Sequence, residues 1–387
     1  MMSEAMMAEA LWSELEHVYI HASAVNSKVA NRVFKVFSKE KISVVDDEPL
    51  RSHKGTLSAE QFERSKKSVY VTPFLGQFFK RCPGSRPGLT CCNYFVLNLG
   101  QQCNMNCSYC YLQSFINSPI MKIYSNIDQA LSELSDMSRT MSQQKLRIGT
   151  GEIIDSLSLD PLTLYSNDLI RFFKNHPNWT LEFKTKSSQV DQFVDVEHAG
   201  NVIVSFSVNP QYVIEREEHG TASLYERLSA AKKASDRGYQ IAFHIDPMIY
   251  HTAWQNSYRE LVSEIALHFK PKDISTFSIG GLRFQPEQRH MMRERFGMNS
   301  LVTSAETFIG SDGKQRYDQQ LRGEMFKFVL SELKSHGFEN AFLCMETPET
   351  WLSAAGAMPK QNPHISALFD GAPLRAVNGH QGMRSQL

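Results

Sequence analysis

The 387-residue chain lacks the charge and the apolar runs that mark a general nucleic-acid binder or a membrane protein. Its 41 basic and 41 acidic side chains cancel, whereas indiscriminate nucleic-acid binders usually carry a basic excess. Zero net charge argues against tight nonspecific binding but allows a local site for DNA. No run approaches eighteen apolar residues, so the sequence predicts no membrane-spanning helix and no membrane partner.

The N-terminal stretch lacks the features of a signal peptide. Residues 1–17 contain acidic side chains and neither a basic start nor a long apolar core. We therefore expect a cytoplasmic protein. Thiols stay reduced in that compartment, so grouped cysteines more often indicate metal or redox chemistry than disulfides. The sequence also shows no internal repeat and no low-complexity tract, and its 42% hydrophobic content is that of an ordinary globular protein.

Strand-like and helix-like segments alternate along most of the chain. Helical patterns such as 126–141, 160–173 and 223–238 separate seven predicted strands, at residues 93–100, 145–150, 180–186, 201–209, 239–249, 274–284 and 340–346. About six strand–helix–strand units in series predict an α/β fold with a partial (βα)6, TIM-like barrel.

A small α/β unit is predicted before the barrel, with strands at 17–21 and 41–47 around a helix at 26–39. The polar, turn-rich stretch from about residue 47 to residue 89 reads as a linker folded against something larger. We expect three parts: an N-terminal unit with this linker (1–89), a barrel (90–350) and a C-terminal tail (351–387).

Three of only seven cysteines stand close together in the segment CNMNCSYCYLQSF: Cys103, Cys107 and Cys110. A structural zinc site needs four ligands, and no nearby histidine or cysteine supplies the fourth. The segment directly follows the predicted strand 93–100, and βα barrels carry their chemistry at the C-terminal ends of the strands. The pattern therefore indicates a metal site that leaves one coordination position open.

A CxxxCxxC motif on the loop after the first barrel strand resembles the motif of the radical S-adenosylmethionine enzymes. Within them, CSYCYLQSF resembles the cluster loop of the spore photoproduct lyase family, and the similarity runs through roughly residues 17–255, including FKTKSSQVDQF and SFSVNPQYVI. The resemblance implies a [4Fe–4S] cluster held by Cys103, Cys107 and Cys110, with S-adenosylmethionine at the open iron. It also implies an external one-electron reductant and a 5′-deoxyadenosyl radical that abstracts hydrogen.

The same resemblance implies roles for residues at other strand ends. The segment after the second strand resembles the GGE segment of many radical S-adenosylmethionine enzymes, in which glycines permit close backbone approach and the acid receives the ammonium of the methionine moiety. Tyr109 and Tyr111 flank the last cluster cysteine, near the cofactor. The expected cofactor-binding residues are Gly149, Thr150, Gly151, Glu152, Lys186, Ser207 and Asp246.

One position departs from the family's pattern. The lyase carries, after its second strand, a cysteine that returns a hydrogen atom to the product radical, and here Glu152 stands at that position. No cysteine occurs between Cys110 and Cys344. Cys344 ends the last predicted strand and is a substitute donor if it faces the cavity, or a buried structural cysteine if it does not. Tyr109 and Tyr111 are the other candidate donors.

Three functions remain open at this point. The first is modification or isomerisation of a 5-substituted thymidine in DNA, as in bacteriophage genome hypermodification, which would take place in the host cytoplasm. The missing cysteine favours it, because the product radical could recover hydrogen from 5′-deoxyadenosine itself. The second is repair of the spore photoproduct with a different donor. The third is radical chemistry on a peptide or small metabolite.

Overall fold

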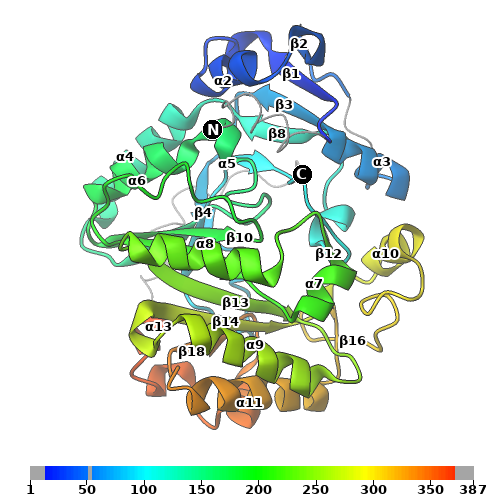
Figure 1. Cartoon of the computed structure of the whole chain (residues 1–387), viewed down its shortest axis with the longest axis vertical. Coiled ribbons are helices and arrows are strands. Elements are labelled where there is room, and N and C mark those ends of the chain that lie inside the picture. Colours follow the sequence, from blue (N-terminus) through cyan, green and yellow to red (C-terminus); the bar gives the residue numbers. More distant parts are fainter. Residues whose placement is uncertain (1–13, 51–54, 371–387) are drawn as a thin grey trace.

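The computed structural model describes residues 14–50 and 55–370 and contains two main sheets (Figure 1). The smaller sheet lies at one end of the molecule in the order β2-β1-β3-β8-β6. Its strands are β1 (His17–His21), β2 (Ile42–Val45), β3 (Ser68–Thr72), β6 (Gly100–Gln101) and β8 (Met121–Tyr124). Helix α2 (Lys28–Val36) crosses between β1 and β2, as predicted, and starts where the Ser27 hydroxyl accepts the Ala30 N–H at 3.2 Å.

The larger sheet is an open half-barrel of seven parallel strands. They follow one another in space in chain order, and all seven were predicted. They are β5 (Tyr94–Leu97), β9 (Leu146–Gly149), β10 (Trp179–Thr185), β11 (Val202–Ser207), β13 (Gln240–Met248), β14 (Ile274–Gly281) and β18 (Ala341–Leu343). The expected fold class, a partial barrel with a small N-terminal α/β unit, is confirmed.

Helices cover the outer face of the half-barrel in every crossover except that from β10 to β11 (Figure 1). Helix α8 begins with a capping box between Ser223 and Glu226 and ends before Gly238, whose φ of 84° suits a glycine after a helix. The crossover helices are α4 (Ile127–Met141), α5 (Asp160–Thr163), α6 (Tyr165–Lys174), α7 (Gln211–Glu217), α8 (Leu224–Asp236), α9 (Trp254–His268), α10 (Gln288–Phe296) and α11 (Gln319–Ser335). No helix of the described residues is both long and apolar enough to cross a membrane.

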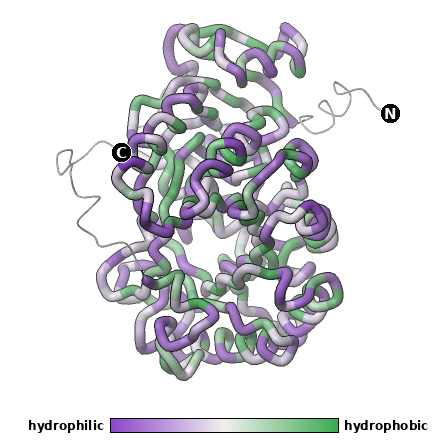
Figure 2. The backbone as a smooth tube through the Cα atoms, turned by 90° about the vertical axis from the view of Figure 1, so that its left-hand side faces the viewer, coloured by the Kyte–Doolittle hydropathy of each residue, from purple (hydrophilic) through white to green (hydrophobic). Residues whose placement is uncertain are grey.

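The two faces of the half-barrel differ sharply in polarity. The outer face packs apolar side chains such as Ile148, Phe183 and Phe206 against the helices. The strand registers align a different set on the inner face: Tyr94, Arg147, Glu182, Lys184, Ser205, Ser207, His244 and Ser278. Figure 2 shows the resulting mixture of polar and apolar positions along the backbone. Parallel strands buried on both faces are usually apolar throughout, so a polar inner face indicates space used by a ligand.

The sheets exchange strands across the boundary expected at residue 89. Strand β4 (Phe79–Arg81), from the predicted linker, pairs antiparallel with β5, so Lys80 joins the inner face opposite Val96. Strand β8, from the expected barrel part, pairs parallel with β3 of the N-terminal sheet. After β18, α12 (Pro348–Ala355) and α13 (Ser366–Phe369) pack Trp351 and Phe369 into the core. Residues 371–387 of the expected tail and the N-terminal residues 1–13 lie outside the described residues.

Gly149 offers a test of how tightly the inner face is packed. A Cβ atom at this position would lie 1.6 Å from the Tyr94 hydroxyl, so Gly149→Ala must displace the ring. We expect a loss of about 1–3 kcal/mol in the free energy of unfolding, measured by urea denaturation, as for other overpacked sites. The control is Gly323→Ala within helix α11, where the nearest atom is a serine hydroxyl at 3.2 Å. Equal stability of the two variants would contradict the packing described.

Candidate active site

The loop that carries the three cysteines is held in place by contacts from several parts of the chain. It leaves β5 through Gln102, which is fully buried, has a φ of 67° and donates its amide to the Ser118 carbonyl at 3.0 Å. The Lys66 ammonium donates to the carbonyls of Cys103 and Met105 at 2.9 and 2.6 Å. Gln288 of α10 donates to the Cys110 carbonyl at 3.1 Å. Side chains from the segment before β3, from the loop itself and from α10 therefore hold the loop backbone in place.

Cys103, Cys107 and Cys110 are free thiols on this one loop. Burial raises the pKa of Cys103 and of Cys107, although Lys66 and Lys186 respectively oppose the shift. The three thiols lie close enough for their charges to interact. Among the described residues, no group of three or more His, Cys, Asp or Glu side chains forms a site for a single metal ion. Three thiolates on one loop fit a [4Fe–4S] cluster with one open iron better than the four-ligand site of structural zinc.

Glu218 ties the cysteine loop to the barrel. Its strand β12 (Glu218–His219) pairs with β7 (Asn106–Cys107) of the loop, directly opposite Cys107. Its carboxylate accepts the Tyr109 hydroxyl and the Asn209 amide, and forms a fully buried ion pair at 2.7 Å with Arg227. Burial alone would raise the pKa of Glu218, but Arg227 and Lys186 more than offset it, and the pKa is lowered.

Tyr109 and Lys186 belong to this arrangement, which determines where their polar atoms point. The Tyr109 hydroxyl is bound to Glu218, and the ring is 8% exposed. The Lys186 ammonium lies 5.7 Å from the centre of the Tyr109 ring. Burial by itself would lower the pKa of Lys186, but Glu218 and Cys107 outweigh burial, so the pKa is raised. The side chain therefore stays charged beside the cysteine loop.

The segment Gly149–Glu152 continues β9 beyond its end and lies beside the cysteine loop. Glu152 forms an ion pair at 3.2 Å with Lys80 of β4, and its backbone carbonyl accepts the Tyr111 hydroxyl at 2.8 Å. Lys80 is thus a cationic partner of Glu152 within the chain, whereas the partner expected from the resemblance is the ammonium of the methionine moiety. Gly149 accommodates the Tyr94 hydroxyl, and Gly151 lies against the Lys184 carbonyl, so both glycines serve close approach of the protein's own atoms.

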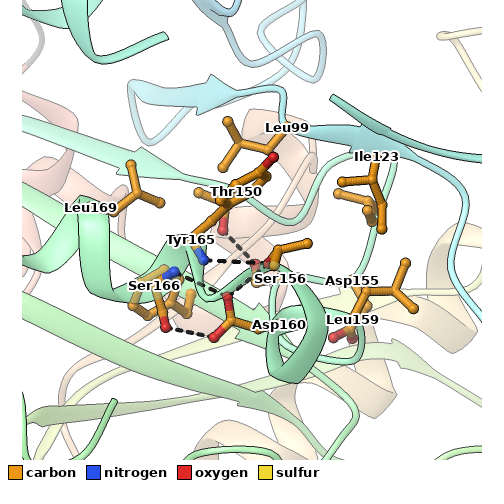
Figure 3. A pocket seen from close by; sticks show the side chains of 13 residues that line it. Leu99, Ile123, Thr150, Asp155, Ser156, Leu159, Asp160, Tyr165, Ser166 and Leu169 are labelled. Atoms are coloured by element: carbon orange, nitrogen blue, oxygen red, sulfur yellow. Dashed lines mark hydrogen bonds between the residues drawn. The ribbon is translucent and has the colours of Figure 1, made fainter. Parts of the chain in front are cut away.

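A small pocket behind this segment is shown in Figure 3. The Thr150 hydroxyl donates to Ser156 at 2.8 Å, and Asp160 accepts two hydrogen bonds from Ser166 at 2.5 and 3.0 Å. Thr150 follows Gly149 and therefore points to the opposite side of β9, toward Leu99 and Ile123 near the N-terminal sheet. The pocket is thus separated from the inner face of the half-barrel.

A buried polar network crosses the inner face below the strand ends. Glu182 accepts the Ser205 hydroxyl at 2.6 Å and pairs with the His244 imidazole at 2.9 Å, while Arg147 lies 3.5 Å away. Burial by itself raises the pKa of Glu182, but Arg147 and then His244 reverse the effect and lower the pKa to about 2. The pKa of His244 is lowered, and its burial is the main cause. The half-barrel is therefore lined by charge rather than filled with aliphatic layers.

Three further expected residues lie at strand ends on the inner face. The Ser207 carbonyl accepts an Arg227 N–H at 2.8 Å. Asp246 is engaged in a two-point ion pair with Arg283 of β15 (Arg283–Phe284), at 2.8 and 3.0 Å. Burial would raise the pKa of Asp246, and Arg283 lowers it well below its usual range. The Cys344 thiol follows β18 beside this pair, and burial raises its pKa to about 12.

Comparison with known proteins identifies the family. The family model for spore photoproduct lyase matches residues 14–342. This chain belongs to the spore photoproduct lyase family. It is 26% identical over 290 residues to spore photoproduct lyase from Geobacillus sp. (strain Y412MC61), covering 73% of this chain and 83% of that protein. It is 27% identical over 251 residues to the Bacillus subtilis (strain 168) lyase, covering 64% and 71%.

The fold agrees with solved structures of this family. A spore photoproduct lyase mutant with bound S-adenosylmethionine and dinucleoside spore photoproduct superposes with a TM-score of 0.74 at 23% identity, covering 86% of this chain and 98% of that one. A spore photoproduct lyase complexed with the dinucleoside gives 0.73. The chain is a radical S-adenosylmethionine enzyme whose cofactors are S-adenosylmethionine and a [4Fe–4S] cluster.

Several residues that build the site were not predicted. Lys80 was assigned to a linker, because a three-residue antiparallel strand leaves no pattern of its own. Arg283 and Arg227 were not singled out by any motif, although each neutralises a buried carboxylate. Glu182 had a detectable signal: in TLEFKTK the polar residues alternate with apolar ones, which predicts a strand with one polar face.

The cysteine loop predicts a specific metal content. After anaerobic reconstitution we expect about four irons and four sulfides per chain, as a single [4Fe–4S] cluster requires. Cys103→Ala, Cys107→Ala and Cys110→Ala should each abolish this uptake, while Cys91→Ala, in the loop before β5, should retain it. Iron and sulfide analysis with absorption spectra provides the measurement. Stoichiometric zinc without iron uptake would overturn the assignment.

A substitution at Glu152 should change S-adenosylmethionine binding without changing the iron content. If its carboxylate receives the ammonium of the methionine moiety, Glu152→Ala should weaken S-adenosylmethionine binding by about ten- to a hundredfold, the value of a lost charge-assisted contact of roughly 1.5–3 kcal/mol. Iron content should not change. Equilibrium binding to the reconstituted protein measures the effect, with Glu215→Ala on helix α7 as a surface control. Normal binding by Glu152→Ala would show that Lys80 is the only partner of this carboxylate.

Proposed function

We propose that this chain acts on a thymine-derived base in DNA and returns a hydrogen atom to the product radical, as a spore photoproduct lyase with a relocated donor. The observation that carries the proposal is the inner face of the half-barrel. It combines cationic side chains with two thiols, Cys344 at one edge strand and Cys82 after the other. The relatives are named spore photoproduct lyases, and solved structures of that enzyme hold the dinucleoside photoproduct.

The substrate's phosphate would find cations already in position. Lys184 lies on β10 and Lys186 directly follows its last residue, Thr185, so the two lysines share the inner face. In the described part of the chain, no carboxylate lies within 4 Å of either ammonium group. Two such side chains attract a phosphodiester even though the net charge of the protein is zero. Their local placement therefore suits a short stretch of DNA with one extruded lesion.

When bound, the cluster and S-adenosylmethionine supply the radical that abstracts hydrogen from the substrate. The chain's own residues would hold the reacting parts together. The cysteine loop presents its thiolates, Glu152 and Lys186 stand beside them, and the polar inner face orients the base through hydrogen bonds. Extruding a base costs a few kcal/mol, which these contacts must recover. The helices on the outer face exclude water from the strand side of the cavity.

A second candidate, isomerisation of a 5-substituted thymidine during DNA hypermodification, is favoured by Glu152 itself. A carboxylate that is ion-paired with Lys80 cannot give a hydrogen atom to a carbon radical. If no thiol acts in its place, hydrogen must return from 5′-deoxyadenosine, and the product keeps the mass of the substrate. The thiols on the inner face make donation by the protein the better-supported route. A peptide or small metabolite has no comparable feature in its favour.

The two candidates make opposite predictions in deuterated water. With DNA or a dinucleoside that contains the spore photoproduct, we expect conversion to two thymines and one solvent deuterium in the product, because a thiol exchanges its hydrogen with water. Liquid chromatography with mass spectrometry measures both. Absence of repair, together with formation of an undeuterated isomer from DNA that carries a 5-substituted thymine, would replace repair by isomerisation. Activity on free nucleoside or peptide alone would remove DNA from the proposal.

A further inference from the structure

The position of Cys82 connects it with the place where the family's donor cysteine is missing. Cys82 follows β4 directly, and its N–H donates to the Tyr94 carbonyl at 2.9 Å, which continues the β4–β5 pairing by one residue. Lys80 and Cys82 are two residues apart in extended backbone and so share a face. Lys80 forms an ion pair with Glu152 at 3.2 Å. Cys82 lies two residues farther along the chain on the same inner face, opposite Tyr94 of β5.

Burial is the main cause that raises the pKa of Cys82 to about 11, and the nearby Cys92, Cys91 and Glu152 add to the shift in that order. The thiol is therefore protonated at neutral pH. The backbone N–H of Gly84 donates to its sulfur. Tyr111, whose hydroxyl binds the Glu152 carbonyl, is close enough to Cys82 and to Cys110 that both raise its pKa further.

Charged groups lie on the inner face beside Tyr94, the residue that pairs with Cys82. Arg147 stacks on the Tyr94 ring at 4.9 Å, and its Nε lies 3.5 Å from Glu182 Oε2 in a buried ion pair. Neither of these two atoms makes a hydrogen bond of normal geometry, so both keep capacity for a polar ligand. This part of the inner face is therefore polar and suited to a polar substrate.

We propose that Cys82 is the thiol that returns the hydrogen atom to the substrate radical, so that the donor has moved from the segment after β9 to the residue after β4, the edge strand on the other side of β5. The proposal rests on the proposed function and assigns its donor. In the step, the S–H bond of Cys82 breaks and a C–H bond forms on the substrate carbon radical, which leaves a sulfur radical on Cys82. One electron from the external one-electron reductant and one proton from water restore the thiol.

The other thiols are placed less favourably for this step. Cys92 accepts a hydrogen bond from Arg147 at 3.2 Å and is thereby engaged with the buried network. Cys344 lies beside Asp246 and Arg283, on the edge strand farthest from β4 in the order of the sheet. Of the described thiols outside the cluster loop, Cys82 is the one that stands beside both Glu152 and Tyr111.

The first test follows solvent deuterium through variants of each thiol. In deuterated water with dinucleoside spore photoproduct, wild-type enzyme and the matched control Cys91→Ala should place one deuterium in the thymine product. Cys82→Ala and Cys82→Ser should still cleave S-adenosylmethionine but give undeuterated or aberrant products. Deuterium that persists in Cys82→Ala and disappears in Cys344→Ala would overturn the proposal while leaving the proposed function intact.

A second measurement does not depend on turnover. In anaerobic protein without reductant, the dinucleoside photoproduct should slow alkylation of Cys82 by N-ethylmaleimide, as read by peptide mass spectrometry, and should leave Cys91 unaffected. If Cys82 is alkylated equally fast with and without the dinucleoside, it does not face the substrate and the proposal fails. If the dinucleoside protects Cys82 in the wild-type enzyme but no repair takes place, the repair function is refuted. The placement of Cys82 beside the bound dinucleoside would then still hold.

Discussion

The site depends on one buried carboxylate, Glu218. Its backbone pairs with the cysteine loop opposite Cys107, and its side chain binds Tyr109, Asn209 and Arg227 at once. A buried charge of this kind is tolerated only when it is paired and hydrogen-bonded, and removing one partner usually costs several kcal/mol. The cysteine loop, the residues after β11 and helix α8 are therefore held in one geometry, which fixes the backbone on which Cys107 stands.

The polar inner face follows from the same requirement. Seven parallel strands bury their apolar residues against the outer helices, so every second residue must point inward. In this chain those residues include Arg147, Glu182 and His244, which satisfy one another across three strands. Filling the interior with aliphatic side chains would be more stable, as replacements of buried ion pairs in other proteins indicate. Retaining charge there keeps the interior open to a polar substrate.

The sequence predicted the parts of the structure that have a local signal. Seven strands and the N-terminal unit were identified, because each is marked by periodicity within a short window. The assignment of Cys103, Cys107 and Cys110 to the cluster rests on their spacing and stays a prediction. Lys80, Arg283 and Arg227 were not, since their importance lies in partners that are 72, 37 and 9 residues away and become visible only when the sheet forms. Strand β8 was missed for the same reason: its pairing with β3 joins two regions that the sequence places in different parts.

Neighbouring strands of a sheet share a layer, and this has a consequence for how an active site can change. A side chain after β9 and one on the edge strand β4, with β5 between the two strands, can approach the same point in the interior, although they are far apart in the sequence. Glu152 and the segment Lys80–Cys82 meet in this way. Loss of a donor at one strand end can therefore be compensated from another strand without any change of fold. An alignment that compares single positions would record only the loss, whereas the pairing of β4 with β5 brings a second thiol, Cys82, to the inner face of the sheet.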